Sequence, residues 1–183
     1  MGDQAKAGIK EARKKMTANS TLLPTFLIIG AAKSGTTALF NHLAKHPEIF
    51  TPYKKELYFF NNDRNYARGS QWYINEYFQQ AQGYSCRGES TPGYLFWGEK
   101  VVPRILENYP GQPPKLIAVF RDPVSRAYSA YWHRVHQGGE TLSFEDALDA
   151  EERRLRDNGT ELCASGFIKY AYFRGGCYAT QLR

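Results

Sequence analysis

The chain has 183 residues, of which 42% are hydrophobic and 15% aromatic. This length and composition exclude a disordered chain and favour one domain with its own core over two. The formal net charge of +6 is milder than a nucleic-acid-binding surface requires, so we predict a small anionic ligand and no nucleic-acid partner.

Much of this charge lies in residues 1–23, which hold five cations and two anions and are predicted to form a basic N-terminal arm. No apolar segment follows these charges, so they do not form a secretory signal. No apolar run reaches the length of a membrane span, and the three cysteines lack the spacing of a metal site or a disulfide framework. We therefore expect a cytoplasmic protein without a membrane span.

The first predicted element is a strand over 25–30, because a continuous apolar run is typical of a parallel strand covered on both faces. A helix is predicted over 35–45, and the pair His46-Pro47 ends it. Residues 51–63 form a loop or a short strand, and a helix with aromatic packing residues follows over 70–81.

The next predicted elements are a strand over 84–89, a helix over 99–108 and a strand over 115–120. Asp122 is a suitable N-cap and Pro123 a suitable first residue for a helix that runs to 136. Ser143 caps a further helix to 157, and the aromatic segment 166–183 is predicted to be helical.

Strands that alternate with helices predict an α/β fold, with a P-loop-type parallel sheet flanked by helices on both faces. The three strands that stand out are fewer than a doubly wound nucleotide-binding sheet usually has.

The turn after the first strand has the pattern of a phosphate-binding loop. Gly30 and Gly35 permit positive φ angles and close backbone approach, so successive amides and a helix N-terminus can surround an anion. The spacing nearly matches G-x-x-x-x-G-K-[ST], but Thr36 stands where that pattern has its lysine, and Lys33 lies inside the turn. This displacement indicates a ligand other than a magnesium–nucleoside triphosphate, unless the segment is an ordinary strand–turn–helix junction.

A second candidate site begins at Arg121, which lies at the carboxyl end of a predicted strand, where open α/β sheets bind ligands. Ser129 lies two turns into the following helix, so both side chains could contact one phosphate. The alternative is that Arg121 is a surface residue paired with Asp122, and that Ser129 only packs.

Four segments in this order resemble the sulfotransferases that use 3′-phosphoadenosine 5′-phosphosulfate (PAPS). They are residues 25–37, 55–60, 89–94 and 121–129. The resemblance covers about 24–182, is greatest for the carbohydrate branch, which includes the heparan sulfate glucosaminyl 3-O-sulfotransferases, and implies a sulfotransferase domain over 24–183.

The resemblance also implies roles for individual residues. Those that match the 5′-phosphosulfate loop are Lys33, Ser34, Gly35, Thr36 and Thr37. Those that match the 3′-phosphate contacts are Arg121 and Ser129, and Glu56 matches the carboxylate regarded as the general base. Without the resemblance, Glu56 would be interpreted as a solvated carboxylate paired with neighbouring lysines.

These residue types suit transfer of a sulfuryl group to an acceptor hydroxyl. Glu56 would take the proton of the acceptor hydroxyl, and such proton transfer typically raises the reaction rate ~10²–10⁴-fold. Lys33 would stabilise the charge on the leaving phosphate. Lys54 or Lys55 would orient an anionic acceptor, a glycan or a small molecule, and no metal is required. Ser90 stands near the acceptor cleft where the family often has lysine.

Other sulfotransferase branches use a histidine base, but the four histidines here are predicted to be structural: His42, His46, His133 and His136. Relatives continue well beyond the equivalent of Arg183, so the fold is predicted to be incomplete at its C-terminus. Two alternatives therefore stay open: a magnesium-dependent P-loop kinase or other phosphotransferase, and a non-catalytic nucleotide-binding remnant.

Overall fold

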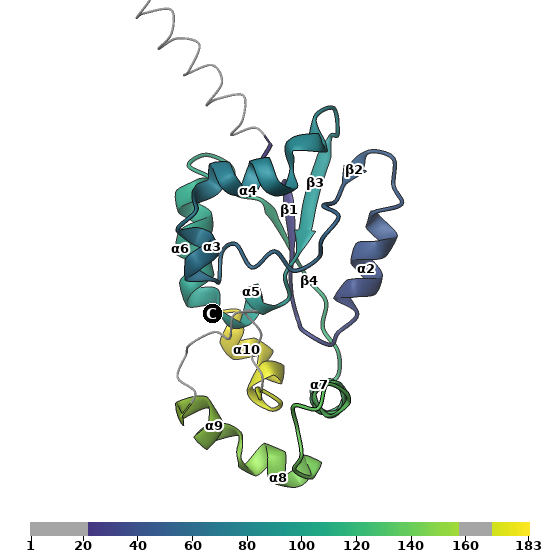
Figure 1. Cartoon of the computed structure of the whole chain (residues 1–183), viewed down its shortest axis with the longest axis vertical. Coiled ribbons are helices and arrows are strands. Elements are labelled where there is room, and N and C mark those ends of the chain that lie inside the picture. Colours follow the sequence, from purple (N-terminus) through teal and green to yellow (C-terminus); the bar gives the residue numbers. More distant parts are fainter. Residues whose placement is uncertain (1–21, 158–169) are drawn as a thin grey trace, which may run out of the picture.

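The computed structural model describes residues 22–157 and 170–183 (Figure 1). Nearly all of the predicted N-terminal arm lies outside the described residues, and so does the first part of the predicted helix over 166–183.

The centre of the molecule is a four-stranded sheet with the order β2-β3-β1-β4, in which every neighbouring pair is parallel. Its strands are β1 (Phe26–Gly30), β2 (Ile49–Phe50), β3 (Cys86–Ser90) and β4 (Lys115–Ala118). The parallel sheet confirms the predicted α/β fold class. The sequence analysis missed β2, which has only two residues and pairs with β3.

The register places β1 between two partners, with Phe26 opposite both Gly88 and Lys115. Leu27 and Ile28 in this strand are fully buried, as expected for a central strand. Gly88 is required beside Phe26, because a Cβ atom at that position would lie 2.0 Å from the Phe26 ring.

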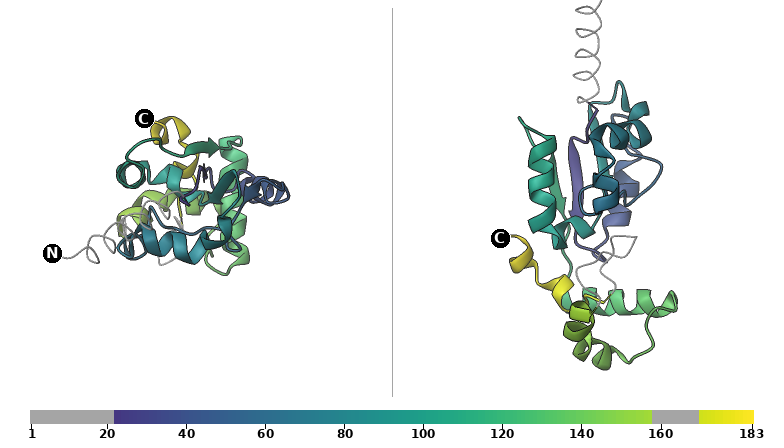
Figure 2. Two further views of the ribbon diagram at one scale, coloured as in Figure 1. Left: turned by 90° about the horizontal axis from the view of Figure 1, so that it is seen from above. Right: turned by 60° about the vertical axis from the view of Figure 1, so that its left-hand side comes forward.

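Short helices surround the sheet. They are α2 (Thr36–Leu43), α3 (Asp63–Tyr66), α4 (Gly69–Tyr77), α5 (Gly93–Phe96), α6 (Gly98–Asn108), α7 (Pro123–His136), α8 (Phe144–Asp149), α9 (Glu151–Asp157) and α10 (Tyr178–Gln181), with 3₁₀ turns η1 (Gln79–Ala81) and η2 (Arg174–Gly176). Helices α6 and α2 lie on opposite sides of the sheet (Figures 1 and 2). Helices α7, α8 and α9 lie beyond the carboxyl ends of the strands. None of the described helices is both long and apolar enough to cross a membrane.

The N-terminal caps of two helices confirm the sequence signals. The Asp122 carboxylate accepts the backbone N–H of Ser125 at 2.8 Å, and Pro123 is the first residue of α7. The Ser143 hydroxyl accepts the backbone N–H of Asp146 at 3.1 Å at the start of α8.

Two predicted helices are wrong in extent. The helix expected over 143–157 is divided at Ala150 into α8 and α9. Within 170–183, only η2 and α10 are helical. Two hydrogen bonds join the places where these differences lie: Glu151 at the start of α9 is buried, and its carboxylate accepts the backbone N–H groups of Phe173 and Arg174 at 2.7 and 2.8 Å. Backbone groups used in this way are not available for helical hydrogen bonds.

The described residues form a large core at the sheet, a small cluster of Phe26, Ile28 and Phe40 between β1 and α2, and a smaller core under α7. The large core includes many aromatic side chains, among them Phe59, Phe60, Tyr73, Phe78 and Tyr94. The smaller core consists of Ala127, Ala130, Tyr131, Ala147 and Tyr172, with partly buried neighbours. The strand ends and α7 therefore belong to different packing units, and the candidate site lies where these units meet.

Candidate functional site

A cavity of about 450 Å³ lies beside the carboxyl ends of β1 and β3. Its walls come from the turn after β1, the loop before α3, the start of α5, one face of α7 and the segment around η2. The polar lining residues are Lys33, Gly35, Thr36, Thr37, Lys55, Glu56, Tyr58, Arg126, Ser129, His133, Arg134, Tyr172, Gly175 and Gln181. This is the position at which parallel α/β sheets bind ligands.

The turn after β1 contributes most of the predicted phosphosulfate-loop residues to this cavity. Lys33, Gly35, Thr36 and Thr37 line it, and Gly35, with φ 95°, is the N-cap of α2. Ser34 does not line the cavity. It is buried, and its hydroxyl has no hydrogen-bond partner among the described residues. The combination of a helix N-terminus, hydroxyls and a cation can bind an anion.

The electrostatics of Lys33 also favour an anion. Burial and the positive charge of Arg121 lower the pKa of Lys33, whereas the negative charge of Glu56 opposes this shift. Repulsion between two cations is relieved by an anion that interacts with both. This part of the cavity can therefore bind a phosphate or a sulfonate.

Glu56 lies in the same cavity, between two partners. Its Oε1 atom is 3.0 Å from the Nζ atom of Lys55, and the Tyr58 hydroxyl donates a hydrogen bond to Oε2. The pairing with a neighbouring lysine matches the simpler interpretation of Glu56. Its place in the cavity wall, however, leaves it available to a ligand.

Backbone strain is concentrated at this site. The non-glycine residues with positive φ among those described are Lys33 (70°), Glu56 (61°) and Tyr58 (53°). Each such conformation costs about 1–3 kcal/mol and persists only where the surroundings enforce it. All three residues line the cavity, which makes it the candidate functional site.

Helix α7 forms the opposite wall, and the structure separates the two predicted 3′-phosphate residues. Ser129 lines the cavity, whereas Arg121 is exposed and is not part of the lining. The Tyr178 hydroxyl donates to the Arg121 carbonyl oxygen at 2.9 Å. Arg121 still acts electrostatically on Lys33, so its charge belongs to the same neighbourhood.

Of the residues predicted to bind the acceptor substrate, only Lys55 lines the cavity. Lys54 is exposed outside it. Ser90 is fully buried, with no partner for its hydroxyl among the described residues, and its carbonyl oxygen accepts the backbone N–H of Glu56 at 3.0 Å. Ser90 thus contacts the loop that carries Glu56 rather than the cavity.

Several lining residues were not predicted as site residues from the sequence, and the deeply buried Arg126 is one of them. This side chain is 2% exposed, and its guanidinium donates to the carbonyl oxygens of Tyr172 and, at 3.0 Å, Ala171. Burial lowers its pKa. His133 also lines the cavity, and burial and the charge of Lys33 lower its pKa. The spacing of four residues from Ser129, which places His133 on the same helix face, could have identified it.

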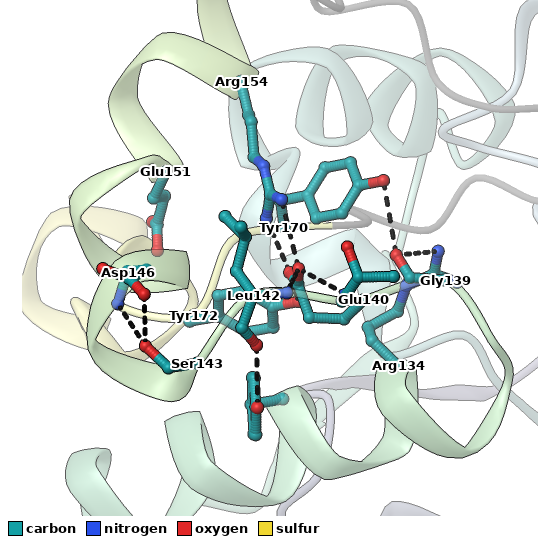
Figure 3. Close-up of polar contacts among 12 residues, drawn as sticks. Arg134, Gly139, Glu140, Leu142, Ser143, Asp146, Glu151, Arg154, Tyr170 and Tyr172 are labelled. Carbon is teal, nitrogen blue, oxygen red and sulfur yellow. Dashed lines mark hydrogen bonds and ion pairs between the residues drawn. The ribbon is translucent and has the colours of Figure 1, made fainter.

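The wall around Tyr172 is supported from outside the cavity (Figure 3). The Tyr172 hydroxyl donates to Glu140 at 2.8 Å, and the Arg154 guanidinium donates to both oxygens of the same carboxylate, at 2.6 and 3.1 Å. Glu140 thus connects the segment before α8 to α9 and to the cavity wall.

Comparison with known proteins identifies the family of the chain. The family model described as "Sulfotransferase domain" matches residues 23–165. The crystal structure of a sulfotransferase from Alicyclobacillus acidocaldarius superimposes with a TM-score of 0.73 at 33% sequence identity, over 87% of this chain and 66% of that one.

Curated relatives include the membrane-associated sulfotransferase kil1 of Dictyostelium discoideum, which is 40% identical over 111 residues, or 60% of this chain and 22% of that protein. Heparan sulfate glucosamine 3-O-sulfotransferase 5 of Mus musculus is 38% identical over 60% of this chain and 30% of its own length. Bifunctional heparan sulfate N-deacetylase/N-sulfotransferase 3 of Homo sapiens is 38% identical over 67% of this chain and 14% of its own length. The chain therefore spans less than a third of each of these relatives. Because the family model matches well over half of the chain, the chain belongs to the sulfotransferase domain family.

Proposed function

We propose that this chain forms the donor-binding part of an enzyme that moves a sulfuryl group from PAPS to a hydroxyl of a carbohydrate. The observation that carries the proposal is that Lys33 and Glu56 line one cavity, a cation that suits the donor and a carboxylate that suits the acceptor. Two relatives are named as sulfotransferases of heparan sulfate, which supports a carbohydrate acceptor.

The cavity residues fit the anionic groups of this donor. Lys33, Gly35, Thr36 and Thr37 would hold the 5′-phosphosulfate at the N-terminus of α2. The buried Ser34 hydroxyl, which lacks a partner among the described residues, is a further donor in this turn. On the opposite wall, Ser129 would contact the 3′-phosphate, with Arg121 contributing its charge from the rim.

The reaction proposed for this site replaces one sulfur–oxygen bond by another. The acceptor oxygen attacks sulfur while its proton passes to Glu56, and the bond from sulfur to the donor phosphate breaks. Adenosine 3′,5′-bisphosphate leaves, and Lys33 stabilises the negative charge on its 5′-phosphate. Lys55 and Tyr58 hold the Glu56 carboxylate in place for the proton, and Lys55 is also positioned to bind an anionic acceptor.

The phosphotransferase alternative is not favoured by this site. Thr36 takes the place of the lysine that such enzymes use. The carboxylate at the end of β3, next to the phosphate-binding turn, is Glu89. This side chain is fully buried, and its oxygens accept hydrogen bonds from three hydroxyls instead of facing the cavity.

Transfer of labelled sulfur from PAPS tests the proposal. Two matched heparan-type oligosaccharides serve as acceptors, one with a free glucosamine amine and one in which only hydroxyls can react. We expect label on the second, with or without a chelator, and no phosphoryl transfer from ATP and magnesium. Label on the amine alone would contradict the hydroxyl acceptor, and magnesium-dependent transfer from ATP would favour the phosphotransferase.

A further inference from the structure

The loop that carries Glu56 is attached to residues 89–94 through five consecutive backbone N–H groups. Its acceptors, in order along the loop, are the Ser90 carbonyl for Glu56 (3.0 Å), the Glu89 carboxylate for Leu57, the Thr91 hydroxyl for Tyr58 (3.4 Å), and the Tyr94 hydroxyl for Phe59 (3.1 Å) and Phe60 (3.3 Å). The loop has no regular secondary structure over these residues. Its conformation therefore depends on these acceptors.

The two hydroxyls that accept loop amides, those of Thr91 and Tyr94, both donate to Glu89. Glu89 is 0% exposed, and its oxygens accept hydrogen bonds from the hydroxyls of Tyr73, Tyr94 and Thr91, each at 2.7 Å. Tyr73 belongs to α4, Thr91 directly follows β3, and Tyr94 belongs to α5. One buried carboxylate therefore connects three separate elements to the loop.

The direction of these hydrogen bonds makes Glu89 necessary. The Tyr94 oxygen accepts two backbone N–H groups, so its own proton must go elsewhere, and Glu89 receives it. The same holds for Thr91, which accepts the Tyr58 N–H and donates to Glu89. A neutral side chain that also presents donors at this position would compete with these hydroxyls for acceptors.

We propose that Glu89 is the positioning residue for Glu56: it orients the hydroxyls of Thr91 and Tyr94 as acceptors, and these hold the left-handed backbone that points Glu56 into the cavity. Glu89 does not line the cavity and acts only through this loop. The role given to Glu56 rests on the proposed function, whereas the attachment of the loop does not.

Two tyrosines provide a matched test. Tyr73 and Tyr94 are both buried, and each donates to the same Glu89 oxygen at 2.7 Å, but the loop amides bond only to Tyr94. Tyr73→Phe and Tyr94→Phe thus remove the same bond to Glu89, and only the second removes the link to the loop. The readouts are hydrogen–deuterium exchange of the loop amides, affinity for adenosine 3′,5′-bisphosphate, and kcat for sulfuryl transfer.

We expect Tyr94→Phe to speed exchange of the Phe59 and Phe60 amides and to lower kcat about 10- to 100-fold with unchanged bisphosphate affinity, since small misplacements of a catalytic group are costly. Tyr73→Phe should leave loop exchange and kcat near those of the wild type. In a second pair, Thr91→Ser should retain kcat and Thr91→Val should lose it.

Equal effects of the two tyrosine variants on loop exchange and kcat would overturn the proposal. Faster exchange in Tyr94→Phe without a fall in kcat would overturn the positioning of Glu56. If the wild type transfers no sulfuryl group, the proposed function fails, and the exchange data still decide whether the hydroxyls that donate to Glu89 hold the loop.

Discussion

Glu89 and Glu140 are both buried carboxylates that support a wall of the same cavity, and they do so with opposite electrostatics. Among the described residues, the partners of Glu89 are three hydroxyls and the Leu57 amide, without a cation, and burial raises the pKa of Glu89. Around Glu140, burial also disfavours the charge, but hydrogen bonds from Arg154, two backbone amides and Tyr172 prevail and lower the pKa to about 2. Burial alone therefore does not decide how a carboxylate ionises.

The difference follows from what each carboxylate holds. Glu89 orients two hydroxyls, and these accept three amides of one loop, a task that needs acceptors rather than charge. Glu140 joins the segment before α8 to α9 and to Tyr172, and the Arg154 guanidinium of α9 provides a strong link. The first carboxylate supports the chemistry proposed for Glu56, and the second supports the stability of the opposite wall.

The largest expected effect is a loss of kcat on substitution of Glu56, whose loop is attached to Glu89. Glu56→Gln removes the proposed base, so kcat for sulfuryl transfer should fall by ~10²–10⁴. Affinity for adenosine 3′,5′-bisphosphate should be unchanged, because Glu56 is assigned to the acceptor. The control is Glu48→Gln, a change in an exposed carboxylate outside the cavity wall. Unchanged kcat in Glu56→Gln would remove Glu56 from the mechanism.

On the Glu140 side the expected effect is on stability. Glu140→Gln removes the carboxylate that pairs with Arg154, and we expect a loss of about 2–3 kcal/mol in the free energy of unfolding, less than for a wholly buried pair because Arg154 is partly exposed. The matched control is Glu152→Gln, which breaks an exposed ion pair with Arg174 and should change little. Denaturant unfolding measures both, and similar effects of the two variants would contradict the role of Glu140.

The smallest expected effect is a dependence on pH. Because the pKa of Glu140 is lowered from 4.5 to about 2 in the folded chain, its contribution is fully present above pH 4.5 and is lost as the pH falls towards 2. Unfolding measured across this interval should show a steeper loss of stability in the wild type than in Glu140→Gln. Parallel curves would mean that Glu140 does not titrate with a lowered pKa.

The features that could be predicted from the sequence are those with local causes. The turn after β1, the Asp122 cap and the first residue of α7 depend on neighbours within a few residues, and each was confirmed. By contrast, β2 pairs with β3 at Ile49 and Cys86, far apart along the chain. The division of α8 from α9 likewise coincides with Glu151 contacts to residues 22 and 23 positions away.

The site shows the same limit. The family resemblance assigned Lys33, Glu56 and Ser129 to one site, and all three line one cavity. Sequence spacing could not show that Arg126 is buried in the wall while Arg121 is exposed and does not line the cavity. Nor could it identify Glu89, whose partners come from three elements. The roles of the site residues and the cytoplasmic location stay predictions.

Titration calorimetry with adenosine 3′,5′-bisphosphate tests most directly whether the cavity at Lys33 binds the sulfuryl donor. We predict that the wild type binds this nucleotide and that Lys33→Ala weakens binding about 10- to 100-fold, the loss expected for one charge-assisted contact. Lys45→Ala, which changes an exposed lysine outside the cavity, should bind like the wild type. Equal binding by the Lys33 variant, or no binding by the wild type, would contradict the donor site.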